Sequence, residues 1–486
     1  MTTIQKCGFF LSILSVAVML TSCGADTSED TIPAQDNTDD TTSQTTEEAV
    51  ESIPLYDFEG STFSFLVPTH ETPIYESHEI AVAELNGNAI NDAVYNRNLM
   101  ISSVCNVSIT AEINKDVTAK GRALILAGDT SYQVYMPYLN GGTALMQEGL
   151  LNDLYQFDGL HLDRNWWDQC ANEGLRIGNK LFFSTGDISI IDDYCAVILY
   201  FNKKLVKDFG LDDPYTLVKD RKWTMDKVFE YADVYVDING DSVKDKNDLY
   251  GLGLTNPAFL WYSCGMTIAS RDGSGNITVD LGTEKNAAVV SVLTDFFQSG
   301  KEGLFWPDWQ VARDSFKNNA LILYTSALGN LALYMNTFDD VEFGLLPLPM
   351  LDENQDDYHT LVSTVAVPGV SIPNHLDRET ASEAATLCDI IARYSTDTVR
   401  HEFYDIALHD RYFSDEESGE MLDIIFQTRV YDLGWIYNWG SVTGLFAKLK
   451  NGNTFASDYE AIKPAIETSL QETIVMAENM INKSDS

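Results

Sequence analysis

A row of oxygen-bearing side chains lies between residues 237 and 248. Six residues stand at positions 1, 3, 5, 7, 9 and 12 of a twelve-residue segment: Asp237, Asn239, Asp241, Val243, Asp245 and Asp248. Calcium is a hard cation that takes about six to eight oxygens, and this spacing is that of a loop which wraps it with alternate side chains and one backbone carbonyl at position 7. The segment therefore predicts a structural calcium ion.

The segment departs from the calcium-loop pattern at two positions. Position 6 is Ser242, where that pattern has glycine for a sharp turn, and Gly240 lies two residues earlier. Position 12 is Asp248, whose side chain is one methylene shorter than the usual glutamate. A magnesium site and a solvated acidic turn without an ion remain the alternatives.

The elements that precede this loop predict an α/β protein. Residues 61–67, 107–113 and 132–137 have the apolar pattern of strands, and residues 91–104 and 121–126 have that of helices. Strands that alternate with helices pair in parallel as βαβ units. Ligands bind such sheets beyond the carboxyl ends of the strands, which directs attention to the loops that follow them.

Two later segments predict crossings between two lobes. Residues 189–201 form a strand-like run that Asp192 and Asp193 interrupt, and residues 341–351 have a proline rhythm typical of an extended strand. The remaining pattern predicts a hairpin at residues 265–279, a helix at 286–297, a strand followed by a helix at 316–335 and a further strand at 360–370. It also predicts a C-terminal helix at 462–481, with Pro464 in its first turn.

The charge balance excludes one class of partner. The 486-residue chain has 31 Lys and Arg against 73 Asp and Glu, for a formal net charge of −42. A nucleic-acid-binding protein needs a basic surface to contact phosphates, so we expect no nucleic-acid partner. The acidity favours uncharged or cationic ligands.

The N-terminus predicts export. Lys6 precedes an apolar run at residues 9–20, which is too short to span a membrane and is typical of a signal peptide. The tetrapeptide that ends at Cys23 resembles a bacterial lipobox, which implies cleavage before Cys23 and its lipidation. An ordinary cleaved signal is the alternative. Residues 24–52 are rich in Thr, Ser, Asp and Glu and predict a disordered tether.

Several segments, in the right order, carry a family resemblance. Residues 202–232 contain an Asn-Lys pair after a strand, an Asp-Pro turn and a Trp-Thr pair before a helix that has an acidic residue early in its first turn. This segment resembles the sugar-type extracellular solute-binding proteins of bacterial ABC importers. Further similarities lie at residues 84–98, 135–142, 237–252, 343–349 and 429–440.

The resemblance implies a two-lobed periplasmic-binding-protein-like fold of type II. Each lobe would hold a mixed sheet flanked by helices, with the ligand cleft between the lobes. The expected organisation is a signal peptide at residues 1–22 and a lipidated cysteine with its tether at 23–52. The first lobe is expected at 53–195 with 346–400, and the second lobe at 196–345 with 401–486.

The resemblance also implies a function. The protein is expected to be a monomer that is anchored by lipid to the outer face of the cytoplasmic membrane. It is expected to capture a carbohydrate, of the oligosaccharide class, and to deliver it to a permease. No zinc-protease, serine-hydrolase or nucleotide-binding motif occurs, so we expect no enzyme. A tethered carbohydrate-active enzyme, which needs only two carboxylates, and a calcium-dependent glycan-adhesion lipoprotein are the alternatives.

Sugar recognition gives the candidate binding residues. Aromatic rings cover the C–H faces of a sugar, and carboxylates and amides bind its hydroxyls. Trp435, Tyr437 and Trp439 alternate, so a strand or extended loop would place all three on one side. A structural role is the alternative for each candidate: Asn140, Trp166, Trp167, Asp187, Asp193, Trp261, Tyr262, Tyr324, Ser326, Trp435, Tyr437 and Trp439.

Three other tryptophans are expected to be structural. Trp223 begins the helix of the family segment, and we predict that it packs inside the protein. Trp306 and Trp309 flank a Pro-Asp pair, and core packing is predicted for both.

Overall fold

The computed structural model describes residues 56–272, 274–330, 341–364, 366–404, 416–452 and 454–480. The chain divides after Pro54, and these residues belong to the second unit, Leu55–Ser486. The predicted signal peptide, Cys23 and the tether lie outside the described residues. In the part of the chain that is described, no helix is long and apolar enough to cross a membrane.

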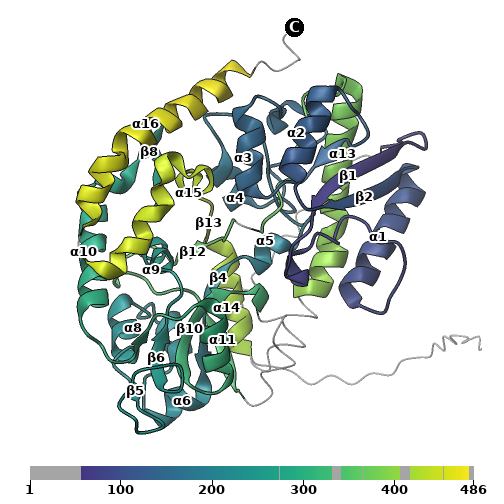
Figure 1. Cartoon of the computed structure of the whole chain (residues 1–486). Helices are drawn as coiled ribbons and strands as arrows, with labels where there is room; N and C mark the ends of the chain where they lie inside the picture. Colours follow the sequence, from purple (N-terminus) through teal and green to yellow (C-terminus); the bar gives the residue numbers. More distant parts are fainter. Residues whose placement is uncertain are drawn as a thin grey trace, which may run out of the picture. The chain divides into compact units, whose positions relative to one another are not determined.

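The first sheet is parallel, as the sequence predicts. Its order is β2-β1-β3, with strands at Thr62–Pro68 (β1), Ser108–Asn114 (β2) and Val134–Tyr135 (β3) (Figure 1). Phe65 faces Ala111 on one side and Val134 on the other, and β1 is almost wholly buried. Tyr135 also pairs with Ser371, so a segment from much later in the chain returns beside β3.

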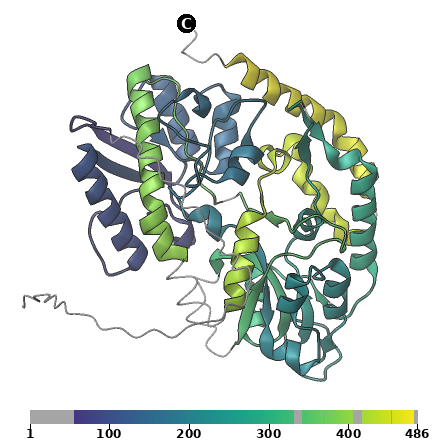
Figure 2. The same cartoon turned by 180° about the vertical axis from the view of Figure 1, so that it is seen from behind.

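Helices accompany this sheet. Figures 1 and 2 both place α1 beside α13, and Arg97 of α1, which is fully buried, donates to the hydroxyl of Ser395 at 2.8 Å. The helices and 3-10 turns of this part are α1 (Ala89–Cys105), α2 (Val117–Ala127), α3 (Leu139–Gln147), α4 (Gln169–Leu175), α13 (Arg378–Ser395), η1 (Pro73–Tyr75) and η2 (Leu154–Gln156). A π-helical turn, η5 (Thr396–Arg400), continues α13.

The second sheet is mixed. Its order is β11-β4-β10-β6-β5, and β9 pairs with β6. β4 runs antiparallel to both of its neighbours, whereas β6 is parallel to β10 and β9. The strands are β4 (Val197–Asn202), β5 (Tyr235–Val236), β6 (Leu249–Gly253), β9 (Leu304–Phe305), β10 (Leu321–Ala327) and β11 (Phe343–Leu346).

The core of this second part packs aromatic side chains against the sheet. Tyr200 of β4 stacks on Tyr324 of β10 with ring centroids 5.7 Å apart, and Phe316 lies against both. The elements around the sheet are α6 (Lys203–Asp208), α7 (Pro214–Lys219), α8 (Met225–Tyr231), α9 (Pro257–Ser263), α10 (Glu284–Gln298), α11 (Trp309–Lys317) and η3 (Asp280–Gly282). The predicted hairpin is confirmed by the antiparallel pair β7 (Ala269–Arg271) and β8 (Ile277–Val279).

The first crossing differs from its prediction. Its aspartates lie in a short helix, α5 (Ile191–Tyr194), and β4 begins only at Val197. A strand would place Asp192 and Asp193 on opposite faces, whereas one helical turn keeps both beside the same neighbours. Nearby, β12 (Thr360–Leu361) pairs in parallel with β13 (Arg429–Val430). The division of the chain into lobes stays a prediction.

The C-terminal segment is helical. It comprises α14 (Glu416–Gln427), α15 (Leu433–Tyr437), η7 (Trp439–Asn451) and α16 (Phe455–Asn479). Ile466, Leu470 and Ala477 of α16 are buried. The placement of Pro464 in the first turn is wrong, because α16 begins nine residues earlier and Pro464 lies inside it.

Trp223 ties the family segment to the second crossing. The side chain is fully buried, and its Nε1 donates to the carbonyl oxygen of Pro347 at 3.0 Å. Its own carbonyl accepts from the backbone N–H of Met350 at 3.0 Å. The structural role predicted for Trp223 is confirmed. Core packing is wrong for Trp309, which is 44% exposed.

We predict that Trp223→Ala lowers the free energy of unfolding by about 3–5 kcal/mol, because it leaves a cavity and an unpaired carbonyl. Urea unfolding followed by circular dichroism measures the change. The matched control is Trp309→Ala, which removes the same side chain from the surface and should cost under about 1 kcal/mol. Equal losses for the two variants would contradict the packing described here.

Candidate functional site

A pocket of about 480 Å³ lies where four separate segments meet. Its walls come from the start of α4, from the loop before α5 together with α5 itself, from η5, and from the end of α14 with β13. The lining residues that carry the chemistry are Trp167, Asp168, Asp187, Asp192, Asp193, Thr396, Arg400, Phe426 and Arg429.

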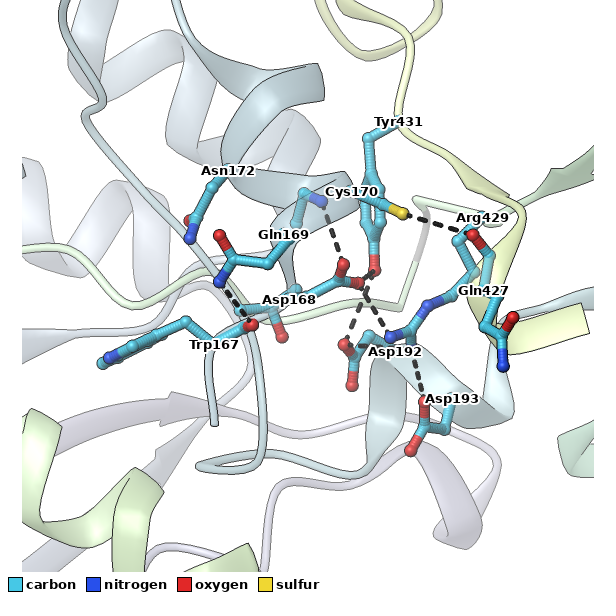
Figure 3. Close-up of polar contacts among 12 residues, drawn as sticks. Trp167, Asp168, Gln169, Cys170, Asn172, Asp192, Asp193, Gln427, Arg429 and Tyr431 are labelled. Atoms are coloured by element: carbon cyan, nitrogen blue, oxygen red, sulfur yellow. Dashed lines mark hydrogen bonds and ion pairs between the residues drawn. The ribbon is translucent and has the colours of Figure 1, made fainter. Parts of the chain in front are cut away.

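Arg429 lies at the centre of a group of carboxylates. Its Nη2 is 3.2 Å from Asp168 Oδ2, its Nη1 is 3.7 Å from Asp192 Oδ2, and Nη1 also donates to Asp193 Oδ1 (Figure 3). The guanidinium carbon lies 5.4 Å from the centre of the Phe426 ring. The side chain of Arg429 is only 13% exposed, so its charge depends on these partners.

Local structure places each of these groups. Asp168 caps the N-terminus of α4 by accepting from the backbone N–H of Ala171 at 3.1 Å. Asp192 and Asp193 are consecutive in α5, and Arg429 is held by the pairing of β13 with β12. Tyr431, two residues after Arg429, donates its hydroxyl to Asp168 Oδ2 at 2.8 Å.

Two buried polar atoms of this group have no hydrogen-bond partner. They are Asp192 Oδ1, an acceptor, and Arg429 Nε, a donor. Asp192 is 2% exposed, and its other oxygen, Oδ2, accepts from the hydroxyl of Tyr431 at 3.5 Å. A buried polar atom without a partner costs about 1–3 kcal/mol, so a ligand that binds both atoms would gain that energy.

Burial shifts the pKa values of the group. Burial raises the pKa of Asp192 well above its ordinary range, and the neighbouring Asp193 carboxylate raises it further. Burial also raises the pKa of Asp193, against the opposing charge of Arg429. Burial disfavours the charge on Arg429, but the Asp168 and Asp193 carboxylates outweigh that effect and its pKa is raised.

A second ion pair forms another wall of the pocket. Asp187 Oδ1 lies 3.2 Å from Arg400 Nε, and the hydroxyl of Thr396 donates to Asp187 Oδ2 at 2.6 Å. Burial raises the pKa of Asp187 to about 7, although Arg400 lowers it. The residue before it must be glycine, because a Cβ on Gly186 would lie 2.5 Å from the carbonyl oxygen of Trp166.

The two adjacent tryptophans share an internal partner. Nε1 of Trp166 and Nε1 of Trp167 both donate to Asp389 Oδ1, at 3.0 and 2.9 Å. Both side chains are buried, and Trp167 lines the pocket. The indole N–H groups therefore serve the protein interior, and only Trp167 adjoins the candidate site.

Trp261 and Tyr262 lie elsewhere, in α9. Trp261 Nε1 donates to Asn286 Oδ1 at 2.8 Å, and the Tyr262 hydroxyl donates to Asp432 Oδ2 at 2.9 Å. Both side chains are fully buried. Burial raises the pKa of Asp432 to about 6, against the hydrogen bonds that it accepts from Ile268, Tyr262 and others.

The three alternating aromatics adopt a different conformation from the predicted one. Trp435 and Tyr437 lie in α15, and Asn438 turns the chain with φ of 49° before Trp439. The extended geometry is therefore wrong. Trp439 is buried and donates to the hydroxyl of Thr473 at 3.0 Å, while its ring stacks on Tyr437 at 5.6 Å.

The remaining candidates are dispersed. Asn140 is exposed at the start of α3, Tyr324 lies in the core of the second sheet, and Ser326 accepts from Asn330 at 2.5 Å. Of the predicted binding residues, the structure brings Trp167, Asp187 and Asp193 into the pocket. The contacts that each makes with a ligand stay predictions.

Four charged residues of the pocket were not among those candidates: Asp168, Asp192, Arg400 and Arg429. Asp168 lies one position after the Trp pair, and Asp192 precedes the candidate Asp193. Arg429 begins a segment that carries the family resemblance, which was a usable signal. For Arg400 no local signal exists, because only tertiary contacts bring η5 to the pocket.

The predicted calcium loop meets its requirements in part. Ser242, at the position of the usual glycine, adopts the left-handed conformation with φ of 64°, and Asp248 Oδ1 is buried without a partner. However, Asp237 Oδ1 and Oδ2 accept from the loop's own backbone N–H groups at Gly240 and Ser242. Among the residues described, no three His, Cys, Asp or Glu side chains gather in a way that could hold a metal ion. Calcium stays a prediction.

Comparison with solved structures identifies the fold, whereas no protein-family model and no curated protein matches the chain. The extracellular solute-binding protein from Staphylococcus aureus in complex with maltose is 14% identical, with 84% of this chain and 98% of that chain covered and a TM-score of 0.56. UgpB from Mycobacterium tuberculosis in complex with glycerophosphocholine is 16% identical, with 85% and 99% covered and a TM-score of 0.53. The ABC substrate-binding protein Lmo0181 from Listeria monocytogenes in complex with cycloalternan is 12% identical, with 85% and 98% covered and a TM-score of 0.51.

These similarities confirm the predicted fold class. The chain has the α/β fold of type II periplasmic binding proteins, and it matches such proteins over most of its length. At these identities the likeness establishes the fold alone, so function must be argued from the site.

We predict that Asp187 makes stability depend on pH. Its folded pKa of about 7 exceeds the value of ~3.9 expected in the unfolded chain. The folded state therefore holds this proton more tightly, and the contribution of Asp187 to stability falls as pH rises from about 4 to about 7. Measured by urea unfolding, Asp187→Asn should gain stability relative to the parent protein across this window.

The control for this prediction is Asp208→Asn in α6, whose side chain is 47% exposed and pairs with Lys204. Its stability relative to the parent should change little with pH. An Asp187→Asn profile parallel to that of the parent would contradict the raised pKa.

For the loop at residues 237–248, we predict that calcium raises the melting temperature and that a chelator lowers it, with ligand binding unchanged. Differential scanning calorimetry with calcium, magnesium or chelator measures the effect, and Asp241→Ala should abolish it. A melting temperature indifferent to all three conditions would rule the ion out.

Proposed function

We propose that the protein is the substrate-binding component of an ABC importer, that it captures a carbohydrate, and that it is not an enzyme. The fold supports this proposal, since the structures that it resembles are solute-binding proteins, some of them in complex with maltose or cycloalternan. The oligosaccharide class, the permease partner and the lipid anchor at Cys23 belong to the same proposal.

The observation that carries the proposal is the pair of unpartnered atoms in the pocket. Asp192 Oδ1 can accept a hydrogen bond, and Arg429 Nε can donate one, and the two side chains are neighbours. A hydroxyl group is both a donor and an acceptor. Two neighbouring hydroxyls of a sugar can therefore bind Asp192 Oδ1 and Arg429 Nε at the same time.

The position of the pocket suits a protein that changes conformation on binding. Its walls come from the start of α4, from η5, from α5 at the crossing, and from β13. A ligand that contacts all of these segments binds one arrangement of them better than another. That differential affinity is what a permease needs to distinguish the loaded protein from the empty one.

We predict that the parent protein binds a soluble oligosaccharide and returns it chemically unchanged. Isothermal titration calorimetry against maltose, maltotriose and cyclic glucans measures binding, and chromatography of the recovered ligand measures turnover. Arg429→Lys keeps the charge but loses Nε and the planar fork, so affinity should fall roughly 10-fold or more.

The matched control is Arg313→Lys in α11, which makes the same change outside the pocket and should leave affinity unaltered. Melting temperatures of both variants establish that they are folded. Hydrolysis of the ligand would contradict a transport role, and binding by no saccharide would contradict the proposed ligand class.

A further inference from the structure

The pocket has more carboxylates than cations. Four aspartates and two arginines line it: Asp168, Asp187, Asp192, Asp193, Arg400 and Arg429. No lysine or histidine is among the described lining residues. Four carboxylates against two guanidinium groups leave a formal charge of −2 if all are ionised, so an anionic ligand would meet repulsion there.

Among the four aspartates of the pocket, Asp192 has the weakest ion pair. Arg400 is engaged by Asp187 at 3.2 Å, and Arg429 lies closer to Asp168 and Asp193 than to Asp192, which is 3.7 Å away. Asp192 Oδ1 has no hydrogen-bond partner although the residue is 2% exposed (Figure 3). An unpaired buried carboxylate is costly, and a cation that reaches it removes the cost.

Several titratable groups surround the Asp192 carboxylate. Asp168 from α4, Asp187 from the preceding loop and Asp193 from the same helix are anionic neighbours, and Arg429 is the cationic one. The Tyr431 hydroxyl donates to it, and the thiol of Cys195 lies in the same surroundings. Burial and the three carboxylates raise the pKa of Asp192 and outweigh Arg429.

We propose that the carbohydrate captured here carries a protonated amine, which donates to Asp192 Oδ1 and neutralises the excess carboxylate. This inference rests on the proposed function, since it specifies the saccharide class. An ammonium group supplies three donors and a positive charge, and a charge-assisted hydrogen bond is about twice as strong as a neutral one. A hydroxyl next to the amine can accept from Arg429 Nε.

The test compares three matched ligands, glucosamine, glucose and N-acetylglucosamine, together with their β-1,4-linked disaccharides and maltose. Titration calorimetry is run at about pH 6, where a sugar amine is protonated. The free-amine sugars should bind roughly 10- to 100-fold more tightly than their acetylated forms.

Asp192→Asn keeps the shape of the side chain and removes its charge. It should abolish the preference for the free amine, while Asp208→Asn, an exposed aspartate of α6, should preserve it. Thermal melts and the affinity for glucose show whether the variant is folded.

Two outcomes would overturn the inference, and they are distinguishable. Equal or tighter binding of the neutral sugars contradicts the amine and leaves the proposed function standing. Binding of none of the saccharides, maltose included, contradicts the proposed function and the inference with it.

Discussion

The buried guanidinium of Arg429 is the constraint on which the site depends. A charge with so little solvent must be paired, and removing one partner of such a pair costs about 3–5 kcal/mol. Its partners are Asp168 at the start of α4 and Asp192 and Asp193 in α5. Arg429 thereby joins its own segment to two segments that lie more than 200 residues earlier in the chain, and the pocket exists because they meet.

The same pairing determines what the pocket can bind. One guanidinium cannot give full partners to three carboxylates, so Asp192 keeps an unused oxygen and Arg429 keeps an unused N–H. The hydroxyl groups of a polyhydroxylated ligand are fixed relative to one another, so they can bind the Asp192 oxygen and the Arg429 N–H at once. Separate water molecules do not have this advantage. The excess of negative charge adds a preference for a cationic substituent over an anionic one.

The sequence predicted the fold well and the site only in part. Alternation of strands and helices has a local signature, so the parallel first sheet and the hairpin at β7 and β8 were predictable. Asp192 and Asp193 were noticed, but their helix was read as a strand, because a run of Ile, Tyr and Cys residues fits either state. The roles of Arg400 and Arg429 depend on contacts across hundreds of residues, and no local pattern reports those.

The most direct test of this account is a crystal structure of the protein with a bound saccharide. The account predicts that the ligand lies in the pocket, with a donor within about 3.2 Å of Asp192 Oδ1 and an acceptor within about 3.2 Å of Arg429 Nε. A saccharide bound at α9 and α15 instead, with both atoms still without a partner, would contradict it.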